Sequence, residues 1–120
     1  MCCNIRHLNL SRCSGVKLYG MNFQAPKLEV LNLSYTEVDD QTLGVISKNC
    51  HGLLQLLLEG CYNITKEGVM HVVENCTQIR EINLRYCVEL LSDVVTSMVS
   101  SSPSLRKIIV PYPSLFTDEQ

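Results

Sequence analysis

LLQLLLEGC, residues 53 to 61, places five leucines in its first six positions. A short apolar run of this kind fits a buried strand and a buried helix equally well, so the rest of the chain has to decide between them. The run is far shorter than the roughly 18 to 20 apolar residues that cross a bilayer. We therefore expect a soluble chain without a membrane segment.

The spacing of three leucines in this stretch recurs along the chain. Leu53, Leu56 and Leu58 follow the pattern apolar-x-x-apolar-x-apolar. Four further copies are Ile5/Leu8/Leu10, Leu28/Leu31/Leu33, Ile79/Ile82/Leu84 and Leu105/Ile108/Val110. Successive copies begin 23, 25, 26 and 26 residues apart. This period is typical of leucine-rich repeats, so the pattern predicts that each copy contains one strand of a repeated unit.

The segments between the strands have helical patterns. Residues 65–75 open with Thr65 as an N-cap and place valines at helical spacing. The unit before opens with Asp39 or Asp40, and the unit after has Ser92 as its cap and is stopped by the proline of the Ser-Ser-Ser-Pro run at 100–103. The first inter-strand segment, 14–27, has two glycines and a proline, which favours a turn or short 3₁₀ structure.

One strand–turn–helix unit cannot bury its apolar face alone, so the units must stack. We predict an α/β leucine-rich-repeat solenoid, a horseshoe arc of about four and a half repeats, with parallel strands on the concave face and helices on the convex face. A single domain covers 1–120. The predicted strands lie near 7–11, 30–34, 55–59, 81–85 and 107–111, and a C-terminal tail covers 113–120.

Six of the seven cysteines fall in two repeat columns. Three residues before each copy lie Cys2, Ala25, Cys50, Cys76 and Ser102, and three residues after it lie Cys13, Thr36, Cys61, Cys87 and Pro113. The shared property is small size, which predicts free thiols buried as small apolar groups. Their odd number and the lack of a signal peptide favour a reducing compartment, so we expect a cytoplasmic or nuclear protein.

Three stretches of the sequence resemble a known protein family. CTQIREINLRYC at 76–87, CYNITKEGV at 61–69 and LEVLNLSYT at 28–36 resemble the cysteine-containing leucine-rich repeats of F-box proteins, the plant members most of all. The resemblance implies that the repeats recognise a substrate for a Skp–cullin–F-box ubiquitin ligase. Only four residues precede the first repeat, so we expect the F-box itself to be absent. That leaves a fragment, a truncated product, or a chain whose open end meets a partner.

Alternate strand positions face away from the core, and stacking turns them into columns on the concave face. These columns are His7/Val30/Gln55/Glu81/Lys107, Asn9/Asn32/Leu57/Asn83/Ile109 and Ser11/Ser34/Glu59/Arg85/Pro111. At the carboxyl ends of the strands come Arg12, Tyr35, Gly60, Tyr86 and Tyr112. The predicted partner-binding residues are Arg12, Tyr35, Gln55, Leu57, Glu59, Glu81, Asn83, Arg85, Tyr86, Lys107, Ile109 and Tyr112.

Tyrosine and arginine are frequent binding hot spots, which supports this set. The alternative is that the tyrosines only pack against neighbouring loops and shield the strand ends from solvent. The three aligned asparagines are equally open: they form a structural ladder or offer amides to a ligand. Leu57 is the apolar exception in their column, and we expect the apolar contact with a partner there.

Other chemistry finds little support in the residues. A net charge of −2 with interspersed signs makes nucleic acid a poor partner. Cys50-His51 with Cys61 lacks a C-x-x-C pair, so we predict no metal, and nothing implies a cofactor. We expect no enzyme activity; a thiol enzyme using Cys3 with His7 or Cys76 with His71 is a remote alternative. The predicted function is protein or peptide binding for a ligase, or as a stand-alone scaffold.

Overall fold

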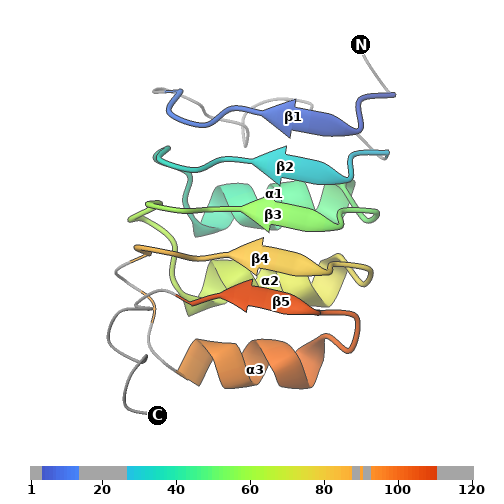
Figure 1. Ribbon diagram of the computed structural model, residues 1–120, viewed down its shortest axis with the longest axis vertical. Helices are drawn as coiled ribbons and strands as arrows, with labels where there is room; N and C mark the ends of the chain where they lie inside the picture. Colours follow the sequence, from blue (N-terminus) through green and yellow to red (C-terminus); the bar gives the residue numbers. More distant parts are fainter. Residues whose placement is uncertain (1–3, 14–26, 88–89, 91–92, 111–120) are drawn as a thin grey trace.

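The computed structural model describes residues 4–13, 27–87, 90 and 93–110. Within them lie five strands and three helices (Figure 1). Their order is β1 (His7–Asn9), β2 (Val30–Asn32), α1 (Asp40–Asn49), β3 (Gln55–Leu57), α2 (Lys66–Asn75), β4 (Glu81–Asn83), α3 (Asp93–Ser101) and β5 (Lys107–Ile109). The protein is therefore α/β, as the alternating patterns predict, and its repeated units are compatible with a solenoid.

The five strands form one parallel sheet in chain order, β1-β2-β3-β4-β5. Each strand starts at the first residue of its predicted range and covers three residues. Backbone pairing continues beyond these bounds, since the Leu33 N–H donates to the Leu57 carbonyl at 2.9 Å and the Tyr35 N–H to the Glu59 carbonyl at 2.7 Å. Backbone hydrogen bonds therefore join successive units along the full length of the apolar pattern.

The middle residue of each strand points into the core. Leu31, Leu56 and Ile82 have no exposed surface, whereas Leu8 and Ile108 in the two outer strands are partly buried. The helices lie on one side of the sheet: in Figure 1, α1 and α2 lie behind the strands, and α3 follows them below β5. A core position is therefore closed only when units stack on both sides, which is the physical reason that a single unit is unstable.

The helix starts agree with the sequence signals. The Asp39 carboxylate caps α1 by accepting the Thr42 N–H at 2.9 Å, and the Thr65 hydroxyl caps α2. Asp40, the first residue of α1, links the start of α1 to the cap of α2, because its carboxylate accepts both the backbone N–H and the hydroxyl of Thr65. A Cβ at Gly68 would collide with this carboxylate, so the link requires glycine there.

Some predictions fall on residues outside the described ranges. These are the turn or 3₁₀ structure of 14–27 apart from Lys27, the Ser92 cap, the tail 113–120, and the placements of Cys2, Cys3, Pro111 and Tyr112. Among the described helices, none combines the length and apolarity that a membrane crossing requires. The end of α3 at Ser101 agrees with the stop expected from the proline at 103.

Four of the column cysteines are buried as predicted. Cys50, Cys61, Cys76 and Cys87 have no exposed surface. The Cys61 thiol donates to the Leu33 carbonyl and the Cys87 thiol to the Leu58 carbonyl, both at 3.1 Å. These bonds reach back to the preceding unit, so the small column also joins neighbouring units.

The prediction that Cys13 is buried is wrong, because its side chain is exposed. It lies in the unit of β1, and β1 is an edge strand of the sheet with β2 as its one neighbour among the described strands. Cys61 and Cys87 donate to carbonyls of the unit before their own, and the described residues place no strand on that side of β1. Position in the column is thus insufficient for burial at the end of a stack.

We expect thiol alkylation of the native protein at pH 8 to separate these cysteines. Burial raises the pKa of Cys50 to about 11 and the pKa of Cys76 and Cys87 to about 12, so little thiolate forms there. Cys13 should react with iodoacetamide within minutes, and Cys50, Cys76 and Cys87 only when the protein opens. Mass spectrometry of tryptic peptides measures each site. A urea-unfolded control should label all four, and fast native labelling of Cys76 would contradict the buried column.

Candidate functional site

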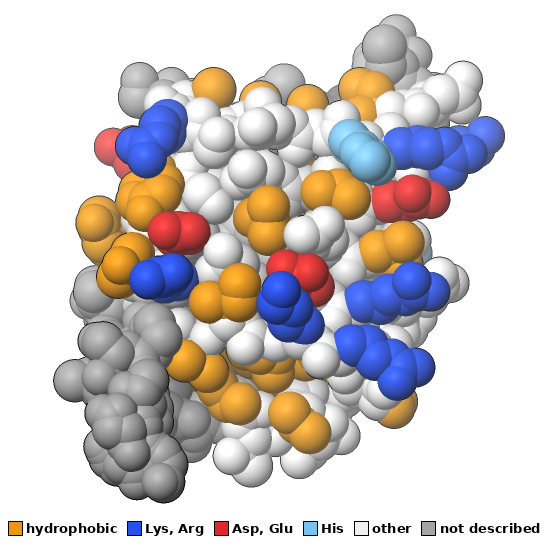
Figure 2. All heavy atoms as spheres, viewed as in Figure 1, with side chains coloured by type: hydrophobic (Ala, Val, Ile, Leu, Met, Phe, Trp, Pro, Cys, Tyr) orange, Lys and Arg blue, Asp and Glu red, His pale blue; other side chains and the backbone are white. Residues whose placement is uncertain are grey.

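One side of the sheet carries no described helix, and we call it the helix-free face. Its outward residues form two columns that the strand register confirms. The columns are His7/Val30/Gln55/Glu81/Lys107 and Asn9/Asn32/Leu57/Asn83/Ile109. Every one of these residues is exposed or half-buried. Figure 2 views this face directly and shows apolar side chains interspersed with charged ones.

The carboxyl edge of this face is built from residues in the left-handed backbone region. Arg12, Tyr35, Gly60 and Tyr86 have φ angles of 62°, 59°, 72° and 64°. Such angles are uncommon for residues other than glycine and carry a strain cost, so the stacked units impose the same sharp turn on each strand end. Gly60 in a column of large side chains was the sequence signal for this turn. The four equivalent positions consequently form one ledge.

The asparagine column has a structural role. The side-chain oxygens of Asn9, Asn32 and Asn83 accept the backbone N–H groups two residues ahead, at 2.9, 3.0 and 3.0 Å. Leu57 cannot do this, and the Glu59 N–H donates instead to the Ser34 hydroxyl at 3.1 Å. These bonds satisfy the backbone where each strand turns, so the amide oxygens have a structural role within their own strands.

A hydrogen-bond network centred on Glu59 joins three consecutive units, those of β2, β3 and β4. The Glu59 carboxylate accepts the Tyr35 hydroxyl at 2.9 Å and the Asn83 amide at 3.4 Å. The bond to Glu59 raises the pKa of Tyr35. The Arg12 guanidinium lies 4.3 Å from the Tyr35 ring centroid, and the ring packs so closely on Gly60 that a Cβ there would overlap it. The Tyr35 side chain therefore stabilises the ledge through its contacts with Glu59, Arg12 and Gly60.

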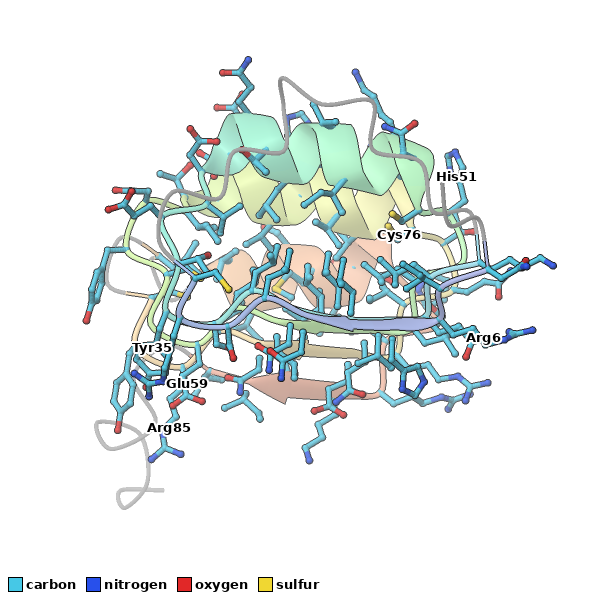
Figure 3. The ribbon with its side chains drawn as sticks, turned by 90° about the horizontal axis from the view of Figure 1, so that it is seen from above. Arg6, Tyr35, His51, Glu59, Cys76 and Arg85 are labelled. Atoms are coloured by element: carbon cyan, nitrogen blue, oxygen red, sulfur yellow. The ribbon has the colours of Figure 1, made fainter. Side chains whose placement is uncertain are left out.

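Tyr86 and Arg85 are placed differently from Tyr35. Tyr86 is 47% exposed, and the Arg85 guanidinium lies 5.1 Å from its ring centroid. Figure 3 shows Tyr35, Glu59 and Arg85 gathered at the same end of the strands, on the side away from the helices. This exposed cation–aromatic pair offers a large contact area next to a polar group, which suits a binding contact.

The structure sorts the predicted partner-binding residues into three groups. Arg12, Tyr35, Glu59 and Asn83 belong to the network, and Arg85 and Tyr86 form the exposed pair. The helix-free face carries Gln55, Leu57, Glu81, Lys107 and Ile109. Tyr112 lies outside the described residues. Their role in binding stays a prediction.

A further column, absent from the predicted site residues, lies at the opposite, amino edge of the sheet. It consists of the residue before each strand, namely Arg6, Glu29, Leu54, Arg80 and Arg106. Arg6 and Glu29 form an ion pair with 3.0 Å between nitrogen and oxygen. The signal was available in the repeat alignment, because three of the five positions hold arginine.

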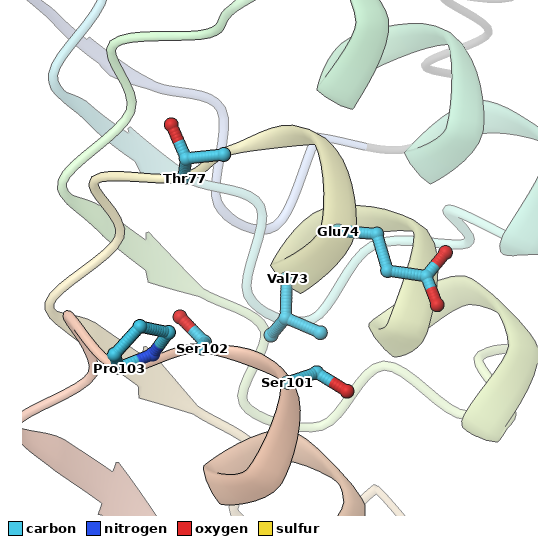
Figure 4. Close-up of a pocket in the computed structure, with 6 residues that line it drawn as sticks. All are labelled: Val73, Glu74, Thr77, Ser101, Ser102 and Pro103. Carbon is cyan, nitrogen blue, oxygen red and sulfur yellow. The ribbon is translucent and has the colours of Figure 1, made fainter.

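On the helix side, a small cleft lies between the carboxyl ends of α2 and α3 (Figure 4). It measures about 200 Å³ and is lined by Val73, Glu74, Thr77, Ser101, Ser102 and Pro103. This lining has one carboxylate and no thiol or imidazole to act with it. Within the described ranges, no group of three or more His, Cys, Asp or Glu side chains is placed to hold a metal ion.

The sequence is similar to two mammalian proteins. F-box/LRR-repeat protein 21 of Mus musculus is 31% identical over 75 residues, which are 62% of this chain and 17% of that protein. F-box/LRR-repeat protein 21 of Bos taurus is 28% identical over 96 residues, which are 78% of this chain and 22% of that protein. The chain thus spans about a fifth of the length of these relatives. No protein-family model matches it. The partial similarities suggest a link to the F-box/LRR family; the plant-type character stays a prediction.

Replacing Gly60 with alanine should lower the free energy of unfolding by about 2 kcal/mol, because the new Cβ meets the Tyr35 ring at a left-handed position. Gly44 in α1 is the matched control, since a Cβ there lies 3.6 Å from the His71 ring in ordinary contact. Gly44→Ala should stabilise by about 0.5 to 1 kcal/mol. Urea unfolding measures both. The cost of Gly60→Ala should shrink in a Tyr35→Ala background; an unchanged cost would refute the ring contact.

Proposed function

We propose that this chain is a protein-binding leucine-rich-repeat module that recognises a substrate in a Skp–cullin–F-box ubiquitin ligase pathway. The similarity to F-box/LRR-repeat protein 21 supports the pathway, and the stacked parallel strands support a repeat surface. The bound protein or peptide lies on the helix-free face, which is the concave face of the horseshoe arc expected from the repeats. A stand-alone scaffold is the alternative when no ligase adaptor is attached.

The observation that carries this proposal is the state of Leu57. It is a half-buried leucine in a column whose other inner members are asparagines bonded to the backbone. The fold does not use its side chain for that bond, because Ser34 accepts the Glu59 N–H. An apolar side chain without this structural task, on a face of mixed polarity, is suited to a desolvated contact with a partner.

The residues around Leu57 supply the polar rim that protein interfaces need. Gln55, Glu81 and Lys107 follow one another in the neighbouring column, and Ile109 adds a second apolar side chain beyond Asn83. Arg85 and Tyr86 border the same face at the ledge. A partner crossing the strands can therefore contact apolar, charged and aromatic side chains from three adjacent units.

The Glu59 network keeps this surface in one conformation before binding. Tyr35 and Asn83 both donate to Glu59, so the ledge loses little side-chain freedom when a partner arrives. Arg12, Tyr35, Glu59 and Asn83 act mainly by shaping the surface in this proposal. Direct contacts come from Leu57, Ile109, Arg85, Tyr86 and the polar column.

Leu57→Asp should abolish partner capture and leave the fold intact, because residue 57 points away from the helices. Leu56→Asp is the matched control one residue away: it buries a charge at a fully buried position and should unfold the protein, at a cost above about 4 kcal/mol. Circular dichroism reports folding. Affinity purification of the tagged chain from cells, with quantitative mass spectrometry, reports capture.

With wild-type chain, recovery of cullin and adaptor together with further proteins lost in Leu57→Asp supports the ligase role. Recovery of those proteins without cullin and adaptor supports the scaffold. A folded Leu57→Asp variant that retains every partner would contradict binding on the helix-free face.

Tyr86→Ala should weaken capture by more than about 1 kcal/mol while thermal stability changes less, because the ring is 47% exposed. Tyr35→Ala is its comparison, and we expect a larger loss of stability there because the ring packs on Gly60 and bonds to Glu59. Titration of a captured partner with each variant gives the affinity, and thermal unfolding gives the stability. Equal stability losses at the two tyrosines would assign both to shielding of the strand ends.

A further inference from the structure

The amino edge of the sheet holds five side chains in a fixed order, Arg6, Glu29, Leu54, Arg80 and Arg106. Backbone hydrogen bonds set this order: the Glu29 N–H donates to the Arg6 carbonyl, the Arg80 N–H to Leu54 and the Arg106 N–H to Arg80, each at 2.8 Å. Neighbouring members are therefore held about one strand spacing apart, roughly 4.8 Å at the backbone. Their proximity does not depend on attraction between the side chains.

The two ends of this column differ in charge balance. At the β1 and β2 end, Arg6 pairs with Glu29 at 3.0 Å. At the β4 and β5 end, Arg80 and Arg106 are both exposed, and within the described residues neither forms an ion pair. Figure 2 shows this difference along one edge of the face, with blue beside red near β1 and β2 and blue without red at the edge near β4 and β5.

Lys107 adds a third positive charge to this corner. It follows Arg106 directly, begins β5 and is exposed. Glu81 stands opposite it in the strand register, without an ion pair between them in the described part of the chain. Three cations thus face one carboxylate, although the chain as a whole has a net charge of −2. We call Arg80, Arg106 and Lys107 the basic corner.

Like charges on neighbouring strands repel, so the basic corner costs free energy that an anion would recover. Guanidinium groups bind phosphate and carboxylate through two parallel hydrogen bonds, and two adjacent guanidiniums suit one doubly charged group. A nucleic-acid backbone needs a longer track of cations than this corner provides. A single doubly charged group on a peptide therefore fits the corner better.

We infer that the basic corner binds a doubly charged anionic group, either a phosphoserine or two adjacent carboxylates, on the protein that the helix-free face captures. Lys107 belongs to the same column as Gln55 and Glu81, so the corner is continuous with that face. The inference rests on the proposed function, since it adds the charge of the partner to the apolar contact at Leu57. Arg80 and Arg106 hold the anion, and Lys107 strengthens its attraction.

The test uses the full chain and three fluorescent libraries of about 13-residue peptides, with a central phosphoserine, Asp-Asp or serine. Fluorescence anisotropy should show at least about tenfold tighter binding of one anionic library than of the serine library, and the tighter one identifies the source of the charge. Arg80→Ala/Arg106→Ala should remove this preference. Arg80→Lys/Arg106→Lys should keep part of it, because lysine retains the charge and loses the paired hydrogen bonds.

Arg6→Ala/Glu29→Ala is the matched control, because it alters the same column where the charges already pair, and it should keep the preference. Circular dichroism should show all variants folded, since their side chains point into solvent. The inference is overturned by equal binding of all three libraries, by no binding at all, by a preference that survives Arg80→Ala/Arg106→Ala, or by equally tight binding of single-stranded DNA.

The Leu57→Asp variant separates this inference from the proposed function. Anion preference that persists in Leu57→Asp supports the basic corner and contradicts a shared site on the helix-free face. Binding of the serine library that is lost in Leu57→Asp and unchanged in Arg80→Ala/Arg106→Ala supports the proposed function and overturns the basic corner.

Discussion

The structure depends on the burial of one apolar column between neighbouring units. Leu31, Leu56 and Ile82 are completely buried because a strand lies on each side and helices lie above. A unit removed from this stack would expose its column to water, so the units stabilise one another and do not fold singly. The requirement for exact stacking of strands then aligns every other position of the repeat, including those with no contact to the core.

This enforced alignment explains the ledge and the basic corner together. At the carboxyl edge it places residues of very different size in the same left-handed turn, and Tyr35 packs over the glycine of the next unit. At the amino edge it places Arg80 beside Arg106 although their charges repel. Both surfaces store a local cost that the buried column outweighs.

The sequence predicted the parts of the structure that follow from periodicity. The apolar pattern located all five strands, and Asp39 and Thr65 marked two helix starts, because burial and capping leave direct signals in residue type. The exposed state of Cys13 could not be predicted from its column, since burial there depends on a neighbouring unit. The Glu59 network was also hidden, because it joins side chains 24 residues apart through the geometry of two turns.

Backbone N–H groups, rather than hydrophobicity, decide which residues the asparagine column can hold. In most units an asparagine accepts the N–H two residues ahead, so replacing it by an apolar residue would leave a donor unsatisfied. The column has two apolar members, Leu57 and Ile109. Two residues after Leu57, the Glu59 N–H donates to the Ser34 hydroxyl. Two residues after Ile109 the sequence has Pro111, which has no backbone N–H. The fold thus tolerates an apolar side chain where the asparagine is dispensable, and the backbone places no demand on the side chains of these two positions.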